Sequence, residues 1–227
     1  ALTGAVTGNV AGNLTGTVAT ATQNSITTMT GLTAAGATGT ATSVAGIPFF
    51  SDISNNSIYT HDVSGTDSTA EGNTGYGIGA LDAVTTGDYN TAIGFGALSA
   101  QQAGEGNVAI GQSALNANLA SNNLAVGKSA MIANTTGTRN IAIGNRALDL
   151  QDTENDNLAI GYEAMTTDNA GGTKNVALGN YALDALTSGD DNTALGYNAM
   201  TNATTGSNNT VVGKDAVASA TVTGSNN

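Results

Sequence analysis

Cysteine and tryptophan are absent from this chain of 227 residues, and histidine and proline each occur once. Without cysteine the chain has no disulfide scaffold, no cysteine-ligated zinc or iron–sulfur site and no thiol nucleophile. A single histidine excludes a multi-histidine metal site and leaves little room for general base chemistry. No apolar run approaches the roughly 18 residues of a membrane span. These absences argue against a metal site built from cysteine or histidine, against thiol chemistry and against a membrane-spanning segment.

Charged residues are also scarce, at 10% of the chain, whereas roughly 25% is typical of globular domains. Five Lys and Arg face 17 Asp and Glu, which gives a net charge of −12. Nucleic acid and anionic lipid surfaces are therefore poor partners. A low charge with much Gly, Ser, Thr and Asn is compatible with disorder, but the periodicity of the chain argues against it.

One sequence motif, Asn-x-Ala-Ile-Gly-x-x-Ala-Leu, recurs through the last two thirds of the chain. It begins at nearly equal steps, at Asn73, Asn90, Asn107, Asn123, Asn140, Asn157, Asn175, Asn192 and Asn209. A Gly always stands four places after the Asn, an Ala seven places after it and an apolar residue eight places after it. Since Asn227 would open a tenth copy and the chain begins with Ala, we expect both ends to continue into a longer protein.

A unit of this length is too short for a helix-turn-helix repeat. Stretches such as Thr91–Gly94 and Ile141–Gly144 indicate short strands with alternating large and small side chains. Each strand ends at a Gly that can turn a corner, and the following Ala-Leu opens a second short apolar segment. Two short strands and two corners per unit predict an all-β parallel β-solenoid of about nine coils, in which neighbouring coils must stack to bury their apolar sides. A helical turn at Ala80–Val84 or Ala182–Leu186 is the local alternative, but these segments are too short for a stable helix.

The columns of the repeat predict the chemistry of each face. We expect the third residue after each Asn, such as Ile93 or Ile110, to point inward. The second residue is nearly always Ala, which indicates a close neighbour, and a second chain is the natural candidate. The fifth and sixth positions are variable and should face solvent. The repeated Asn predicts a hydrogen-bonded ladder with its neighbours and with corner backbone groups.

The residues before the repeat fall into two further segments. Residues 1–46 are rich in Gly and Thr, with a four-residue period at Gly4, Gly8, Gly12 and Gly16, and predict a thin fibrous stalk wound from several copies. Residues 47–72 contain the densest apolar patch of the chain and predict a neck or cap that closes the open end of the solenoid. The repeat solenoid then spans residues 73–227.

The repeat resembles the head repeats of trimeric autotransporter adhesins, which wind as left-handed β-rolls in a three-chain bundle. Those units are usually shorter, so we expect the extra residues to enlarge the outer loop. Combined with the stretch Gly8 to Ala21, the chain is more similar to bacteriophage tail fibres, especially marine ones. The resemblance implies a homotrimer in a virion fibre or on a cell surface, attached to other fibre proteins at both ends and involved in host attachment. It implies no catalytic residue and no cofactor.

Three groups of residues are candidates for sites. His61, Asp62 and Ser64 are sequence neighbours, whereas members of a catalytic triad normally come from separate elements, so catalysis is disfavoured. The acidic stretches 152–156 and 189–191 could bind Ca²⁺ but fit solvated loops better. The possible glycan contacts are the aromatic residues at the fifth and sixth positions: Phe95, Tyr162, Tyr181 and Tyr197.

The sequence therefore predicts a non-enzymatic structural segment of a phage tail fibre or a similar virion appendage. The alternative is the head domain of a bacterial trimeric autotransporter adhesin. An ice-binding solenoid is more remote, because the residue after each Asn is not Thr in the middle copies, where Val108, Leu124 and Ile141 stand.

Overall fold

The computed structural model describes residues 42–44, 47–52, 57–59, 69–150, 152–167, 172–202, 204–218 and 224–226. The chain divides into units 1–37 and 38–227, and all described residues belong to the second. The stalk predicted for residues 1–46 thus lies outside the described residues, apart from residues 42–44.

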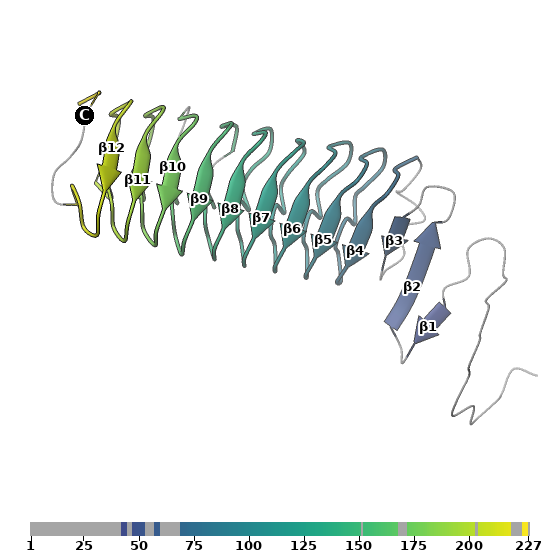
Figure 1. The fold of residues 1–227 in the computed structure, drawn as a ribbon. Coiled ribbons are helices and arrows are strands. Elements are labelled where there is room, and N and C mark those ends of the chain that lie inside the picture. Colours follow the sequence, from purple (N-terminus) through teal and green to yellow (C-terminus); the bar gives the residue numbers. More distant parts are fainter. Residues whose placement is uncertain are drawn as a thin grey trace, which may run out of the picture. The chain divides into compact units, whose positions relative to one another are not determined.

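The described residues form twelve short strands, and none of them is helical (Figure 1). Consequently no described helix could span a membrane. The strands are β1 (Thr42–Val44), β2 (Ile47–Asp52), β3 (Ser57–Tyr59), β4 (Thr74–Tyr76), β5 (Thr91–Ile93), β6 (Val108–Ile110), β7 (Leu124–Val126), β8 (Ile141–Ile143), β9 (Leu158–Ile160), β10 (Val176–Leu178), β11 (Thr193–Leu195) and β12 (Thr210–Val212).

All twelve strands join one sheet in chain order. The pairs β1–β2 and β2–β3 are antiparallel, whereas every pair from β3 to β12 is parallel. Each strand from β4 to β12 begins directly after a repeat Asn and pairs in register with the same three positions of the next coil. The fold is therefore the predicted parallel β-solenoid, with one repeat unit per turn.

One turn contains a single short strand, such as β5, and the expected second strand is not formed. The segment after the corner Gly consists of successive turns, closed by hydrogen bonds such as Ala80 N to Gly77 O and Val84 N to Leu81 O. The amide of Leu81 also donates to Ala97 O in the next coil. This wall is hydrogen-bonded from coil to coil without extended geometry, and the helical alternative at Ala80–Val84 and Ala182–Leu186 is wrong.

The predicted orientation of the strand side chains is also wrong, because the Ala column points inward. Ala92, Ala109 and Ala142 are fully buried within a single chain. Because side chains alternate along a strand, the flanking first and third positions point outward, and Ile93 and Ile110 are about two fifths exposed, at 40% and 38%. The coil is thin, so its own opposite wall is the close neighbour that selects Ala.

The apolar part of the interior of most turns includes the strand Ala, the Ala seven places after Asn and the apolar residue eight places after it. A further buried column stands eleven places after Asn and contains Val84, Gln101, Asn118, Asn134 and Leu186. Leu98, Met131 and Leu148 represent the column eight places after Asn, and their exposed fraction is at most 1%. All nine members of the column adopt left-handed backbone geometry, with φ between 50° and 58°. This conformation costs L-residues about 1–2 kcal/mol each, while full burial of a Leu or Met side chain contributes about 1.5–3 kcal/mol.

The repeat Asn residues form the predicted ladder, and each of them ties two turns together. Every Asn amide Nδ2 donates to the carbonyl three residues before the next Asn, at 2.7–2.9 Å, which closes its own turn. Every Oδ1 from Asn73 to Asn192 accepts the backbone N–H of the following Asn, at 2.8–3.1 Å. These side chains are buried, with at most 2% exposed.

The Gly four places after each Asn is required for two reasons. Its φ lies between 131° and 145°, a region that L-residues rarely adopt. A Cβ on Gly94 would also stand 2.6 Å from the carbonyl oxygen of Gly111 in the next coil. The corner glycines thus touch along the solenoid axis.

Near the first turns the interior differs from the repeat. Gly75 replaces the strand Ala in β4, and a Cβ there would lie 3.0 Å from the ring of Tyr59, which is buried. In addition, β1 pairs with β2 across the predicted boundary between residues 46 and 47. The assignment of residues 47–72 as a cap remains a prediction.

A corner substitution tests the double requirement for Gly. Gly94→Ala should lower the free energy of unfolding by more than about 3 kcal/mol, because both the backbone region and the neighbouring carbonyl oppose a Cβ. Gly96→Ala is the matched control: its φ of 64° is shared by side-chain-bearing residues such as Ser113 in the same column, and its Cβ would meet no atom closer than 3.5 Å. Urea unfolding followed by circular dichroism measures both, and equal losses would contradict this account.

Removal of one Asn from the ladder should destabilise the two turns that it links. Asn140→Ala leaves the backbone N–H of Asn157 and the carbonyl of Glu154 without their partner, and we expect a loss of about 2–5 kcal/mol. Asn145→Ala removes one exposed hydrogen bond, from the amide of Lys128 at 3.0 Å, and should cost less than about 1 kcal/mol because solvent can replace it. Chemical denaturation compares the two variants, and a loss at Asn140 no larger than at Asn145 would refute the ladder's role.

Candidate interaction surfaces

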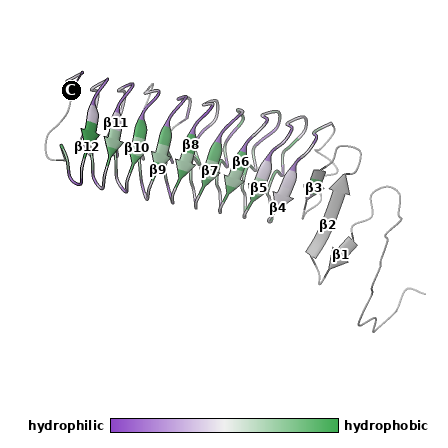
Figure 2. Cartoon of the chain, in the orientation of Figure 1, coloured by the Kyte–Doolittle hydropathy of each residue, from purple (hydrophilic) through white to green (hydrophobic). Residues whose placement is uncertain are grey.

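The outward side of the sheet is a continuous apolar strip, called here the aliphatic face. It consists of the third strand positions from β5 to β11 and the first strand positions from β6 to β10. Its exposed third-position members include Ile93, Ile110, Leu178 and Leu195, at 38–41% exposure, and Ile141 contributes from the first position. Figure 2 shows the hydrophobic colour following these strands and the hydrophilic colour on the loops. Contiguous exposed apolar surface of this kind typically marks an interaction site.

A second surface lies at the corner that follows the strands. Tyr162, Tyr181 and Tyr197 come from three successive turns, and they are called here the aromatic row. The ring centroids of Tyr162 and Tyr181 are 5.5 Å apart, and those of Tyr181 and Tyr197 are 6.0 Å apart, both in edge-to-face geometry. The ammonium of Lys214 in the next turn lies 5.9 Å from the Tyr197 ring centroid. Phe95, the fourth predicted contact, lies four strands away, after β5, and does not belong to the row.

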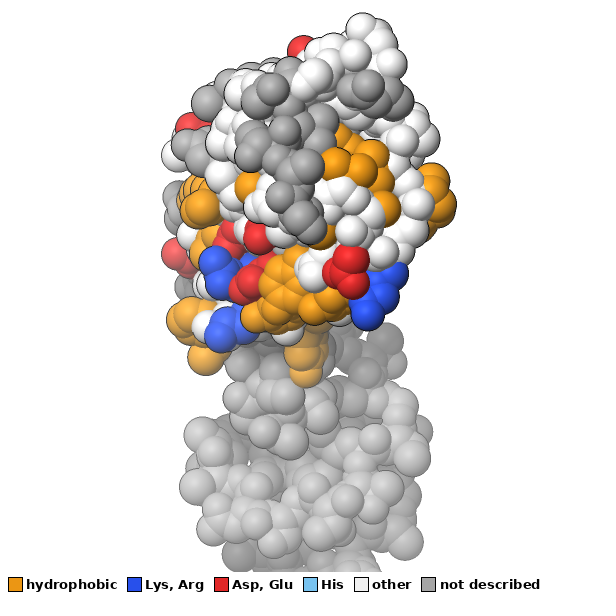
Figure 3. Space-filling model, turned by 90° about the vertical axis from the view of Figure 1, so that its left-hand side faces the viewer, with side chains coloured by type: hydrophobic (Ala, Val, Ile, Leu, Met, Phe, Trp, Pro, Cys, Tyr) orange, Lys and Arg blue, Asp and Glu red, His pale blue; other side chains and the backbone are white. Residues whose placement is uncertain are grey.

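An ion-pair network adjoins the row at Tyr162. Arg146 donates from Nε to Asp149 at 2.8 Å and from a terminal nitrogen to Glu163 at 2.6 Å. Burial raises the pKa of the Asp149 carboxyl, and the hydrogen bond from Arg146 opposes that change. Hydrogen bonding to the Glu163 carboxylate raises the pKa of the Tyr162 phenol. The cation is therefore shared by two carboxylates. Figure 3 views the solenoid from its β12 end and shows hydrophobic, cationic and acidic side chains close together on its lower side.

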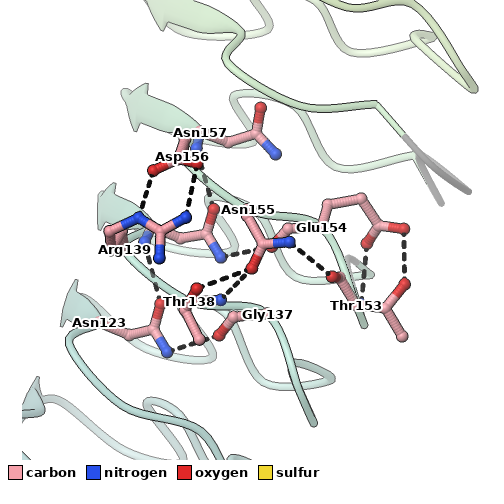
Figure 4. Close-up of polar contacts among 10 residues, drawn as sticks. Asn123, Gly137, Thr138, Arg139, Thr153, Glu154, Asn155, Asp156 and Asn157 are labelled. Carbon is pink, nitrogen blue, oxygen red and sulfur yellow. Dashed lines mark hydrogen bonds and ion pairs between the residues drawn. The ribbon is translucent and has the colours of Figure 1, made fainter.

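A third feature is the column directly before the repeat Asn, where charges alternate over four turns: Arg139, Asp156, Lys174 and Asp191. Arg139 and Asp156 form a two-pronged ion pair at 2.6 and 2.8 Å (Figure 4). Hydrogen bonding to Arg139 lowers the pKa of the Asp156 carboxyl. Because the pair is largely exposed, its contribution to stability is small.

The acidic stretch 152–156 does not gather its carboxylates around one point. Asp156 binds Arg139, and Asp152 accepts a hydrogen bond from Thr135 in the preceding turn. Glu154 is buried and accepts the backbone amides of Asp152 and Thr153 at 3.0 Å (Figure 4). Asp190, in the other acidic stretch, accepts from the amide and hydroxyl of Thr173. Glu154 thus binds its own loop, whereas Asp152, Asp156 and Asp190 each bind a residue of the preceding turn. His61, Asp62 and Ser64 lie outside the described residues.

The proximity of the three tyrosines is obscured in the sequence because their spacing is irregular. Tyr162 and Tyr197 stand five places after their Asn, whereas Tyr181 stands six places after it. The step that leads to Asn175 is also one residue longer than the steps on either side of it, so the two gaps between the tyrosines are unequal. The fifth and sixth columns contain all three tyrosines, and only their order by successive turns shows that they are consecutive.

The Tyr162–Glu163 contact makes a spectroscopic prediction. In Glu163→Gln the phenol of Tyr162 should titrate closer to its ordinary pKa of 10.0, so one of the six tyrosines should ionise earlier in an ultraviolet titration. The raised pKa favours the neutral phenol in the folded state. Its stabilising effect is therefore present below pH 10.0 and disappears as the pH rises through the folded value. Glu105→Gln is the control, and identical curves for all three proteins would refute the contact.

Comparison with known proteins adds no family to these observations: no protein-family model, no curated protein and no solved structure matches the chain.

Proposed function

We propose that this chain is a structural segment of a homotrimeric fibre, of the kind found in phage tail fibres, which supports attachment to a host surface. The observation that carries the proposal is the aliphatic face. It runs along the solenoid through the strands β5 to β11, and contiguous exposed apolar residues of this kind mark protein–protein interaction sites.

Identical copies are the partners that fit this face best. The strands stack at a spacing of about 4.8 Å, so a parallel neighbour of the same chain repeats every outward row at the same interval. Leu178 and Leu195 of one chain would then meet equivalent rows of the others. A closed ring of such chains leaves no apolar strip open to water.

The turns of the solenoid suit a fibre mechanically. Hydrogen bonds parallel to the axis occur at the strand, at the corner and on the opposite wall, for example Thr91 N to Asn107 O, Gly94 N to Tyr76 O and Leu98 N to Ala114 O. Because each turn is tied to the next at three places around its circumference, bending of the segment would strain several bonds at once. Such a segment can hold a binding tip at a distance, and its outer corners can vary without disturbing the core.

The oligomeric state provides the test. Light scattering coupled to size-exclusion chromatography should give a mass near three times the 22.2 kDa of one chain. The double variant Leu178→Asp/Leu195→Asp should shift the mass to that of the monomer, because each chain would bring two carboxylates into the buried interface. Both positions are exposed in one chain, so the variant should keep its strand-type circular dichroism.

The matched control is Gln112→Asp/Asn145→Asp, which adds the same charge at exposed corner positions and should leave the mass unchanged. A monomeric wild type, or a trimer that persists in the Leu178→Asp/Leu195→Asp variant, would overturn the proposal.

A further inference from the structure

We propose that the aromatic row of Tyr162, Tyr181 and Tyr197 binds a neutral polysaccharide chain that lies along the solenoid axis. The inference deepens the proposed function, since it assigns a ligand class to a fibre that reaches a host surface, and it rests on that function only for its biological setting. The site itself is argued from the geometry of the row.

The row is accessible and separate from the aliphatic face. Tyr162 and Tyr197 are 43% and 45% exposed. They follow the corner Gly, whereas the aliphatic face consists of strand positions before it. Occupation of one surface therefore does not require the other.

The rings are held in place before any ligand arrives. Tyr181 stands edge-to-face between the other two rings. Its amide donates to Tyr162 O at 3.0 Å, and the amide of Asp215 donates to Tyr197 O at 2.8 Å. The amide of Tyr162 is held by Asn180 Oδ1 at 2.9 Å. A preordered aromatic surface loses little conformational entropy on binding, which favours recognition.

The charges around the row indicate a neutral ligand. Arg146 is shared by Asp149 and Glu163, and Lys214 lies near Asp215 and above Tyr197. Neither cation is left without an acidic neighbour, and the chain as a whole carries −12, so an anionic polymer would be repelled.

The remaining chemistry of the row suits a sugar. A pyranose has an apolar C–H face and a rim of hydroxyl groups, and tyrosine presents an apolar ring with a polar edge. Asn180 and Asn198 lie beside the rings in the adjoining columns, and among the described residues the Nδ2 of Asn180 donates to no other group. From Tyr162 to Tyr197 the row extends over two turn spacings, about 10 Å, which exceeds one sugar residue and therefore favours a chain.

Native affinity electrophoresis of the full chain tests the site directly. The gels contain one of four neutral polysaccharides (dextran, laminarin, galactomannan or hydroxyethyl cellulose) or one of two anionic ones (alginate or chondroitin sulfate). At least one neutral polymer should retard the wild type. Tyr181→Ala should weaken that binding about tenfold, as expected for the loss of one well-packed aromatic contact, whereas Tyr181→Phe should retain most of it.

The matched control is Phe95→Ala, which removes an exposed ring from the same corner on a distant turn and should leave the retardation unchanged. The inference is overturned if no neutral polymer retards the wild type, if only the anionic polymers do, or if Tyr181→Ala and Phe95→Ala bind alike. The mass of each variant by light scattering is a separate readout, so loss of glycan binding with an unchanged oligomer would leave the fibre proposal standing.

Discussion

The paired hydrogen bonds of the repeat Asn are the constraint from which the other columns follow. In each carboxamide, Nδ2 donates a hydrogen bond that closes its own turn, and Oδ1 accepts a hydrogen bond from the backbone N–H of the Asn in the next turn. Since both bonds are buried, a turn that slipped by one residue would leave a donor and an acceptor unsatisfied in every coil. The register fixed in this way brings like residues into contact along the axis. Ala then stacks on Ala inside, and corner Gly lies on corner Gly.

Tight winding of the coil requires backbone strain, and the structure shows how that strain is distributed. In most turns two exposed or half-exposed positions, before the Asn and six places after it, adopt positive φ, and Arg139 and Arg146 illustrate both. The third such position is the buried Leu or Met, where the gain from burial is comparable to or larger than the backbone cost. At the corner four places after Asn no side chain could offset the contact with the next carbonyl, so Gly stands there in all nine copies. Identical residues at a column therefore reflect local geometry, because a repeated shape imposes the same steric limit in each turn.

The sequence was sufficient for the period, the strand that follows each Asn, the corner Gly and the Asn ladder, because each depends on contacts between neighbouring turns that the repeat itself encodes. It was insufficient for the side on which Ala lies. Ile and Leu normally fill interiors, so Ile93 and Leu195 were expected inside. The strand position that faces the opposite wall is instead Ala, and the Leu or Met of the turn segment occupies the interior. The left-handed conformation of Leu98 or Leu148 contradicts the local preference of Leu and could be found only from the closed coil. The sequence named the three tyrosines but not the contact between their rings, because a shift of one place put Tyr181 in the neighbouring column.

Placement of Ala rather than Ile in the interior has a consequence for function. Two Ala, one Leu or Met and the repeat Asn are buried inside most coils, while large aliphatic side chains of the strand remain partly exposed on the outside. The apolar surface that a globular domain would use to stabilise itself is thus available for association with copies of the chain. The corner columns do not contribute to the ladder or the core. The position five places after Asn is therefore free to vary, and it is occupied by Gln112, Lys128 and Tyr162 after three different strands. In the proposed fibre the sheet face supports assembly, and substitutions at the corner leave the ladder and the core unaltered. The aromatic row, for which we propose glycan binding, stands at such a corner.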